Sequence, residues 1–340
     1  MKRVVCFGEI MMRLNPPGYR RFVQTDTFEA TYAGGEANAA VSLAQYGLDA
    51  AFVSKLPEHE IGQCALNALR RYGVDTRHVL RGGNRLGIYF VEKGASQRAS
   101  KVIYDREGSA VTKASPEEFH WDDILRDADW FHFTGITPAL SDSLAAACLD
   151  AVQTAKKLGV RVSCDLNYRK KLWSREKACE VMTGLMPYVD VCIANEEDAA
   201  DVFGIHAQNS DVESGVLDRQ GYVNVARQLT ERFGFKAVAI TLRESLSASD
   251  NRWGAMLYQD AQAYMSKRYT VHIVDRVGGG DSFGGGLIYA LLMDYKPQDA
   301  VEFAAAASCL KHSIEADYNL VTPSEVAQLA AGDASGRVQR

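Results

Sequence analysis

The chain has little that would bind a nucleic acid or cross a membrane. It has no long block of Lys or Arg, and its formal net charge is −5, which argues against a nucleic-acid surface. No apolar run approaches the length of a membrane span, and Glu9 interrupts the first apolar stretch before a signal-peptide core could form. The sequence therefore predicts a small-molecule partner, with neither nucleic acid nor membrane involved.

The cysteines are few and lack metal-binding spacing. No CxxC pair occurs, and no His lies at zinc spacing from a Cys. The seven are Cys6, Cys64, Cys148, Cys164, Cys179, Cys192 and Cys309. Most of them lie in apolar segments, as is typical of core residues in a reducing cytosol. We therefore expect buried free thiols and a cytoplasmic location.

Two familiar phosphate-binding motifs are also absent. The chain contains no Gly-Lys pair, which excludes a GxxxxGK[ST] loop. A GxGxxG match beginning at Gly278 fails because its last position is Phe283. A dinucleotide-binding fold that opens on this loop is therefore not expected.

What the chain does have is six glycines around one carboxylate, in VGGGDSFGGGLIYALL at 277–292. Apolar residues at helical spacing follow, so Gly278, Gly279 and Gly280 precede a helix N-terminus, where free N–H groups suit a phosphate. A side chain at Gly279 is expected to crowd that phosphate. Asp281 could cap the helix or accept a proton from a bound group, and these residues alone leave both roles open.

Apolar strands alternate with amphipathic helices along most of the chain. This order is typical of a parallel sheet covered by helices on both faces, so the fold class is α/β. The expected strands are RVVCFGEI, AAFVSKL, DWFHFTG, VRVSCDL, VDVCIAN and KAVAITL.

Residues 13–35 and 85–111 break this order, because they show the period-two alternation of antiparallel strands. They could form a small sheet that acts as a lid or as an interface between copies of the chain, and an edge extension without function is the alternative. The division predicted is a main domain of 1–12, 36–84 and 112–330, a lid of 13–35 and 85–111, and a frayed tail of 331–340.

Polar residues gather where the predicted strands end, which is where ligands bind in parallel sheets. Oxygen donors in DLNYR and ANEED suit Mg²⁺, directly or through its waters, and TLRES offers groups to phosphate oxygens. Each set is weak evidence alone, but together with GGGD they supply what phosphoryl transfer requires. The residues are Asp165, Asn167, Arg169, Asn195, Glu196, Glu197, Asp198, Thr241 and Arg243.

Two motifs together resemble the ribokinase-like carbohydrate kinases and, within them, the 2-keto-3-deoxygluconate kinases. AGGEANAAVSLAQYG at 33–47 is similar to the family's sugar-binding signature, and DRVGGGDSFGGG at 275–286 is similar to its ATP and catalytic signature. The resemblance implies an α/β/α domain with a small β-sheet lid, and phosphorylation of a sugar hydroxyl with ATP and Mg²⁺. It also implies that Asp281 is the catalytic base and that the amides of Gly278, Gly279 and Gly280 form the anion hole.

The resemblance also implies further roles, position by position. Asn195 matches the start of an N-x-x-E element for magnesium and phosphate whose fourth position here is Asp198, one methylene shorter than Glu. Asn167, Thr241 and Arg243 are expected at the nucleotide. The residues expected to contact an acidic sugar are Gly34, Gly35, Asn38, Tyr89, Tyr104, Arg106, Arg169 and Asp317.

The resemblance favours ATP-dependent conversion of 2-keto-3-deoxygluconate to its 6-phosphate. A fructokinase or ribokinase acting on a neutral sugar is the alternative enzyme, and a sugar-binding relative without activity is the alternative from another class. The distinction depends on Arg106, which suits a sugar carboxylate. Its other expected role is an exposed ion pair with Asp105 or Glu107.

Overall fold

Parallel strands form the centre of the molecule. The computed structural model describes residues 1–195, 197–206 and 219–333, and its main sheet has the order β13-β12-β11-β10-β9-β8-β1-β4-β5, with β14 paired to β12. From β11 to β5 all neighbours in this order are parallel, whereas β12, β13 and β14 are antiparallel additions. The bounds are β1 Arg3–Phe7, β4 Asp49–Leu56, β5 Val79–Arg81, β8 Trp130–Thr134, β9 Arg161–Asp165, β10 Val191–Ala194, β11 Ala237–Ser245, β12 Asp250–Gln259, β13 Gln262–Met265 and β14 Tyr269–His272.

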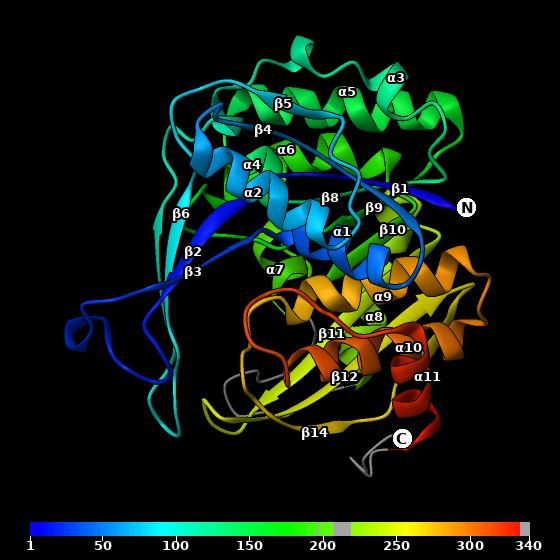
Figure 1. Ribbon diagram of the computed structural model, residues 1–340. Coiled ribbons are helices and arrows are strands. Elements are labelled where there is room, and N and C mark those ends of the chain that lie inside the picture. Colours follow the sequence, from blue (N-terminus) through cyan, green and yellow to red (C-terminus); the bar gives the residue numbers. More distant parts are fainter. Residues whose placement is uncertain (196, 207–218, 334–340) are drawn as a thin grey trace.

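Helices cover both faces of this sheet (Figure 1). Successive residues of β1 point to opposite faces: Val4 and Cys6 belong to one apolar core, Val5 and Phe7 to the other. The first core contains α1 (Gly35–Gln45), α2 (Glu60–Arg71), α9 (Gly279–Leu292), α10 (Pro297–Lys311) and α11 (Pro323–Ala331). The second contains α3 (Trp121–Ile124), α5 (Asp142–Leu158), α6 (Arg175–Leu185), α7 (Asp198–Phe203) and α8 (Arg219–Phe233), while α4 is Ile136–Ala139. The architecture is therefore a three-layer α/β/α sandwich.

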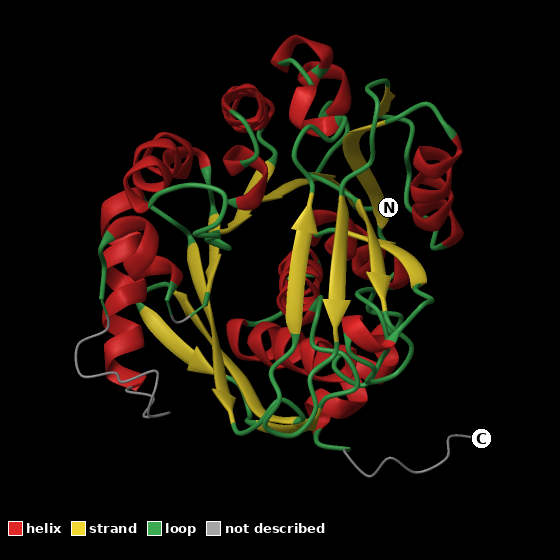
Figure 2. Ribbon diagram, turned by 90° about the vertical axis from the view of Figure 1, so that its left-hand side faces the viewer, coloured by secondary structure: helices red, strands yellow, loops and turns green. Residues whose placement is uncertain are grey.

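A second sheet lies apart from the first, at the left of Figure 1 and facing the viewer in Figure 2. It has the order β3-β2-β6-β7. One face carries the buried side chains of Arg13 and Tyr89, and the opposite face carries half-buried Met12 and Phe90. The bounds are β2 Met11–Asn15, β3 Glu29–Ala33, β6 Ile88–Glu92 and β7 Lys101–Asp105. The short 3-10 helices are η1 Phe22–Gln24, η2 Val111–Lys113, η3 Pro116–Glu118 and η4 Met186–Tyr188.

The α/β prediction is confirmed, and each strand expected for the parallel sheet is present. The antiparallel strands β12, β13 and β14 were not predicted. Residues 334–340 of the predicted tail lie outside the described residues, and within the described part no helix is long and apolar enough to span a bilayer. The cysteine prediction is partly wrong, since Cys64 is exposed and Cys179 and Cys309 are half-buried.

Candidate active site

The glycine run forms the start of α9. Gly278 is the N-cap residue with φ +84°, a left-handed conformation that favours glycine. A Cβ at this position would lie 2.1 Å from the carbonyl oxygen of Asp317, so no larger residue fits there. A Cβ on Gly280 would meet no atom within 4 Å. Open space therefore lies beside the first turn of the helix, where N–H groups and the positive dipole end attract an anion.

Two expectations about this stretch are wrong. Asp281 does not cap the helix, because α9 begins at Gly279 and Asp281 is already its third residue. A side chain at Gly279 would not point at a phosphate either. Its Cβ would lie 2.7 Å from Cε1 of His312, and burial lowers the pKa of this histidine to about 4, so a neutral ring packs behind the helix start. Gly280 is the position that faces open space.

Asp281 lies beside the sugar-signature helix α1. Nδ2 of Asn38 donates to Oδ2 of Asp281 at 2.7 Å, and a Cβ on Gly35 would lie 3.4 Å from Oδ1. Burial raises the pKa of Asp281 to about 7. The Asn38 hydrogen bond opposes this shift, and the charges of Asp317 and Glu36 add to it. Asp281 is thus a carboxylate that can take up a proton near neutral pH.

The strand-end acids lie close enough to influence one another. Burial raises the pKa of Asp165 well above its usual value, and the charges of Asp198 and Asp281 raise it further. Both carboxylate oxygens of Asp198 accept backbone amides, from Tyr168 at 3.1 Å and from Asn195 at 3.0 Å. The side-chain oxygen of Asn195 accepts the amides of Glu197 and Asp198, at 2.8 and 3.0 Å. This reciprocal cap accounts structurally for the pairing of Asn195 with Asp198.

The described residues contain no group of three side chains that could by themselves hold a metal ion. Glu196 lies outside the described residues. Asn167, which follows β9, has φ +40°, a conformation that Asn tolerates, and its backbone amide bonds to the Asp165 carboxylate. The predicted metal residues therefore lie at one sheet edge but are not a complete coordination shell.

The prediction that Thr241 and Arg243 lie at the end of a strand is wrong. They lie inside β11, which continues to Ser245 in a long hairpin with β12. Thr241 lies one residue beyond the pair that Ala194 makes with Ile240, and so level with the end of β10. The charge of Arg243 lowers the pKa of the neighbouring Arg276, after the larger effect of burial. Two guanidinium groups thus lie near the residues that lead into the glycine run.

The sugar signature begins α1. Gly34 is its N-cap residue, and a Cβ there would lie 1.9 Å from the carbonyl oxygen of Glu9, so only glycine fits. The amide of Gly34 donates to Oδ1 of Asn38 at 3.3 Å, and Asn38 in turn donates to Asp281. The three signature residues Gly34, Gly35 and Asn38 therefore lie next to the predicted catalytic base.

Tyr89 and Asp317 contact each other, and the carboxylate of Asp317 also binds Arg13. The hydroxyl of Tyr89 donates to Oδ2 of Asp317 at 2.7 Å, and Nη1 of Arg13 donates to Oδ1 at 2.5 Å. Nη2 of Arg13 donates to Oδ2 of Asp275 at 2.5 Å, and the Arg13 side chain is 0% exposed. The resemblance implied that Asp317 contacts the sugar. In the structure it anchors the small sheet to the segment just before the glycines.

Arg106 has neither of the partners expected for an exposed arginine. Asp105 pairs with Arg85, whereas Arg106 pairs with Glu9, whose carboxylate accepts its Nε at 2.8 Å and its Nη2. The guanidinium carbon lies 5.5 Å from the ring centroid of Tyr104. Tyr104 and Arg106 lie side by side as predicted, although β7 ends at Asp105 and Arg106 is the first residue beyond it, and the predicted pairing with Asp105 or Glu107 is wrong.

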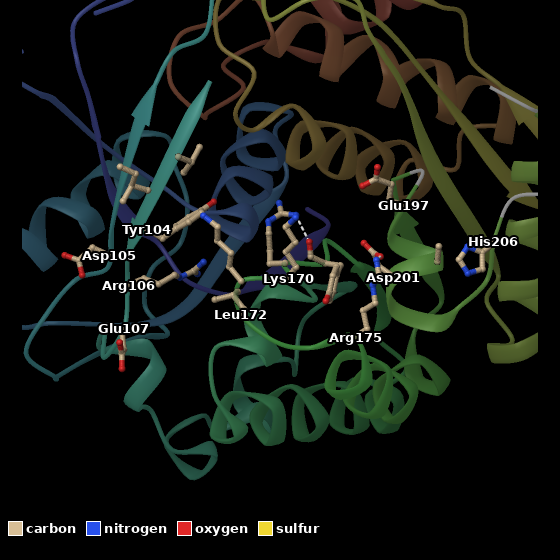
Figure 3. A pocket seen from close by; sticks show the side chains of 16 residues that line it. Tyr104, Asp105, Arg106, Glu107, Lys170, Leu172, Arg175, Glu197, Asp201 and His206 are labelled. Atoms are coloured by element: carbon tan, nitrogen blue, oxygen red, sulfur yellow. Dashed lines mark hydrogen bonds and ion pairs between the residues drawn. The ribbon is translucent and has the colours of Figure 1, made fainter. Parts of the chain in front are cut away.

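A cavity of about 1130 Å³ separates the end of β7 from the segment after β9 and from α7. Figure 3 shows Tyr104 and Arg106 on one wall and Lys170, Arg175 and Asp201 across the cavity. Arg169 also lines it, with Nη1 donating to the Tyr168 carbonyl at 3.0 Å. Its charge lowers the pKa of Asp281, which opposes the larger effect of burial. Arginine and lysine side chains thus line the cavity together with acidic ones, which are Asp105, Glu107, Glu197 and Asp201.

Four charged residues around the site were not predicted. Glu9 holds Arg106, Arg13 bridges two acids, and Arg276 lies beside Arg243. Lys311 is buried and donates to the carbonyl oxygens of Ile314 at 3.2 Å and Asp275 at 3.4 Å. Only Arg13 could have been predicted to be buried, because the period-two alternation places it on the same strand face as the apolar residue Met11.

Open space beside the first turn of α9, the carboxylate of Asp281 next to it and a nearby cavity lined by charged side chains are features that phosphoryl transfer to a small molecule would use. The chain belongs to the pfkB family of carbohydrate kinases, whose family pattern matches residues 1–320.

Named relatives are similar over nearly the whole chain. The structure of 2-dehydro-3-deoxygluconokinase from Thermotoga maritima is 52% identical, with a TM-score of 0.95, and the match covers 98% of this chain and 100% of that one. The 2-dehydro-3-deoxygalactonokinase of Haloferax volcanii is 34% identical over 98% of both chains. The 2-dehydro-3-deoxygluconokinase of Thermoproteus tenax is 30% identical, over 97% of this chain and 94% of that protein.

Proposed function

We propose that the protein transfers the γ-phosphoryl group of ATP to the 6-hydroxyl of 2-keto-3-deoxygluconate, which is also named 2-dehydro-3-deoxygluconate. The observation that carries the proposal is the position of Asp281, next to the open first turn of α9 and hydrogen-bonded to Asn38 of the sugar signature. Relatives that bear the name of this kinase support the choice of sugar.

In the reaction, the sugar 6-hydroxyl oxygen attacks the γ-phosphorus, and its proton passes to the carboxylate of Asp281. ADP leaves with the electron pair of the broken P–O bond. Because phosphoryl transfer has a loose transition state, Asp281 mainly orients the hydroxyl and accepts the proton late. The amides at Gly278, Gly279 and Gly280 stabilise charge on the transferring group, and such donors contribute roughly 3 kcal/mol.

We also propose that ATP brings Mg²⁺, with Asn167, Thr241 and Arg243 near the nucleotide. The raised pKa of Asp165 reflects burial and repulsion from Asp198 and Asp281, and a cation would relieve that repulsion. Mg²⁺ keeps several waters and binds mainly through phosphates, so an incomplete protein shell fits it. Asp198 and Asn195 would hold it through water, and the ion would neutralise charge on the phosphates.

Recognition of an acidic sugar is assigned to the cations of the cavity. A carboxylate taken out of water requires a cationic partner, and Arg106 and Arg169 line the space that the sugar would enter. Arg106 offers a planar fork that Lys does not. Tyr104 adds a ring whose face lies near Arg106 and whose plane stacks on Tyr89, with 6.0 Å between ring centroids.

The test is ADP formation with a panel of sugars. We expect 2-keto-3-deoxygluconate to give the highest kcat/KM, and the panel includes its C4 epimer 2-keto-3-deoxygalactonate because one relative bears that name. Preference for fructose or ribose would refute the acidic-sugar assignment. ADP formation with none of the sugars would favour a sugar-binding protein without activity.

We further propose a homo-oligomer formed through the outer face of the small sheet, in a cytoplasmic enzyme. Apolar side chains at paired positions line that face without full burial: Met12 opposite Ile88, and Leu14 opposite Phe90. The ring of exposed Phe28 packs against that of Phe90, with 5.9 Å between the ring centroids. Analytical ultracentrifugation of Phe90→Glu against the parent tests this oligomer, and an unchanged mass would refute it.

The free cysteines throughout the described residues support the proposed cytoplasmic location.

A further inference from the structure

Glu9 lies in the segment that joins β1 to β2, where the chain leaves the main sheet for the small one. Its side chain is 3% exposed. One carboxylate oxygen, Oε2, accepts Nε and Nη2 of Arg106. The other, Oε1, accepts the hydroxyl of Ser109 at 2.5 Å. Both oxygens of this buried acid are therefore used to grip the segment that follows β7.

The grip leaves one edge of the guanidinium available. A guanidinium presents donors along more than one edge, and Glu9 occupies the edge formed by Nε and Nη2. Within the described part of the chain, Nη1 makes no hydrogen bond to protein, and Arg106 lines the cavity. Figure 3 shows the Arg106 side chain directed toward the opposite wall, while Asp105 points away from it. The edge containing Nη1 is the one that a ligand can reach.

Two glycines make room for this arrangement. A Cβ on Gly87 would lie 2.7 Å from Oε1 of Glu9 and 3.4 Å from Cβ of Arg106. A Cβ on Gly34 would lie 1.9 Å from the backbone oxygen of Glu9. The backbone of Glu9 thus touches the sugar signature while its side chain holds Arg106, so one residue fixes the distance between the two.

We propose that Glu9 is a positioning residue for acid recognition, which holds the guanidinium of Arg106 so that its free edge meets the carboxylate of the sugar. The inference rests on the proposed function, in which the acceptor is a sugar acid. Glu9 then contributes to specificity without contacting the sugar. A neutral sugar does not bind the free edge, so the contact between Glu9 and Arg106 does not increase its affinity.

The length of the Glu9 side chain, called its reach below, and its negative charge have opposite effects on the binding of a sugar acid. The reach preorganises Arg106, whereas the negative charge repels a second carboxylate brought to the same guanidinium. Glu9→Asp keeps the charge and removes the reach. Glu9→Gln keeps the reach and removes the charge. A positioning role therefore predicts that the aspartate variant is the more damaging of the two.

The experiment compares 2-keto-3-deoxygluconate with 3-deoxyfructose, which carries a hydroxymethyl group in place of the carboxylate. 3-Deoxyfructose is measured as a substrate or, where turnover is slow, as a competitive inhibitor. In Glu9→Asp we expect KM for the acid to rise about tenfold, the worth of one charged hydrogen bond, with kcat and the constants for 3-deoxyfructose changed less than about twofold. In Glu9→Gln the acid KM stays within about threefold of the parent value.

Glu92→Asp is the matched control, because Glu92 is an equally buried acid of the small sheet that pairs with Arg98 at 3.0 Å. It lies outside the cavity lining, so we expect no selective change for the acid. Should Glu9→Asp fail to fold by thermal melting, Ser109→Ala decides. It frees Oε1 of Glu9 without altering Arg106, and a selective rise of the acid KM of about threefold is expected.

Two results for Glu9→Asp would overturn the inference. Equal losses of kcat/KM on both sugars are what a purely structural residue predicts. An unchanged KM for the acid is what is expected if the Glu9–Arg106 pair has no role in binding. The same holds for Ser109→Ala. A larger selective loss in Glu9→Gln than in Glu9→Asp would assign the effect to charge and also overturn it. If the parent enzyme phosphorylates no sugar acid, the proposed function falls as well, so the two failures are distinguishable.

Discussion

Replacing Asp281 by Asn separates its chemical role from its structural one. The amide has the same shape as the carboxylate, and its oxygen can accept the Asn38 hydrogen bond that Oδ2 now accepts at 2.7 Å. The amide cannot take up the proton of the sugar hydroxyl. We therefore expect kcat to fall roughly 10²- to 10⁴-fold, the range for a lost general base, while both substrates still bind.

The same variant is expected to be more stable than the parent. Burial raises the pKa of Asp281 from 3.8 to about 7, so the folded state binds the proton more tightly than the unfolded chain does. Stability is therefore lost as the pH rises from about 4 to about 7, and the full penalty is present above 7. At about 1.4 kcal/mol per pKa unit the penalty is roughly 4 kcal/mol at pH 8 and about 2 kcal/mol at pH 5.

Two measurements test this reasoning. ADP formation gives the rate, and thermal or denaturant unfolding at pH 5 and pH 8 gives the free energy of unfolding. In the parent, kcat/KM should fall about tenfold per pH unit below the Asp281 pKa, because that profile reports the base in the free enzyme. An Asn variant that retained activity within a few-fold would refute the role of Asp281. A stability gain equal at both pH values would refute the raised pKa.

Four further variants have distinct expected results. Arg106→Ala should lower kcat/KM for 2-keto-3-deoxygluconate by roughly 1.5 to 3 kcal/mol and leave 3-deoxyfructose less affected, so equal losses would contradict a carboxylate contact. Gly280→Val should abolish turnover, because its side chain enters the open space proposed for the phosphate, and should change the melting temperature little. Gly279→Val should unfold the protein, because its side chain would clash with the buried ring of His312. The reverse ranking of the two variants in activity and melting assays would contradict the assignment. Arg13→Met should cost roughly 3 to 5 kcal/mol in urea unfolding because two buried carboxylates lose their partner, and a neutral effect would contradict it.

The local signals of the sequence were enough to predict the parallel sheet and the glycine-rich start of a helix beside Asp281. A glycine run before an apolar helix has a meaning that depends on neighbouring residues only, so Gly278 and Asp281 could be located without knowledge of distant contacts. Their exact positions required the structure. The start of α9 at Gly279, rather than after the glycines, decides that Asp281 is not a cap and that Gly280 faces open space.

The charged contacts could not be predicted, because they join residues that are far apart in the sequence. Arg13 and Asp317 are 304 positions apart, and Glu9 and Arg106 are 97 apart. A period-two pattern tells which face of a strand is buried, but it does not tell which acid will face a buried cation there. For Arg106, the sequence offered only its neighbours Asp105 and Glu107 as partners.

The buried charges explain why the small sheet has one position on the main domain. An apolar interface tolerates sliding, whereas Arg13 is 0% exposed and loses both ion pairs if β2 moves relative to Asp275 and Asp317. Asp275 leads into the glycine run and Asp317 packs against Gly278. The hydrogen bond that Tyr89 donates to Asp317 is thus continuous with the contacts around the first turn of α9. In this chain the same buried charges therefore hold the small sheet in place and contact the start of α9.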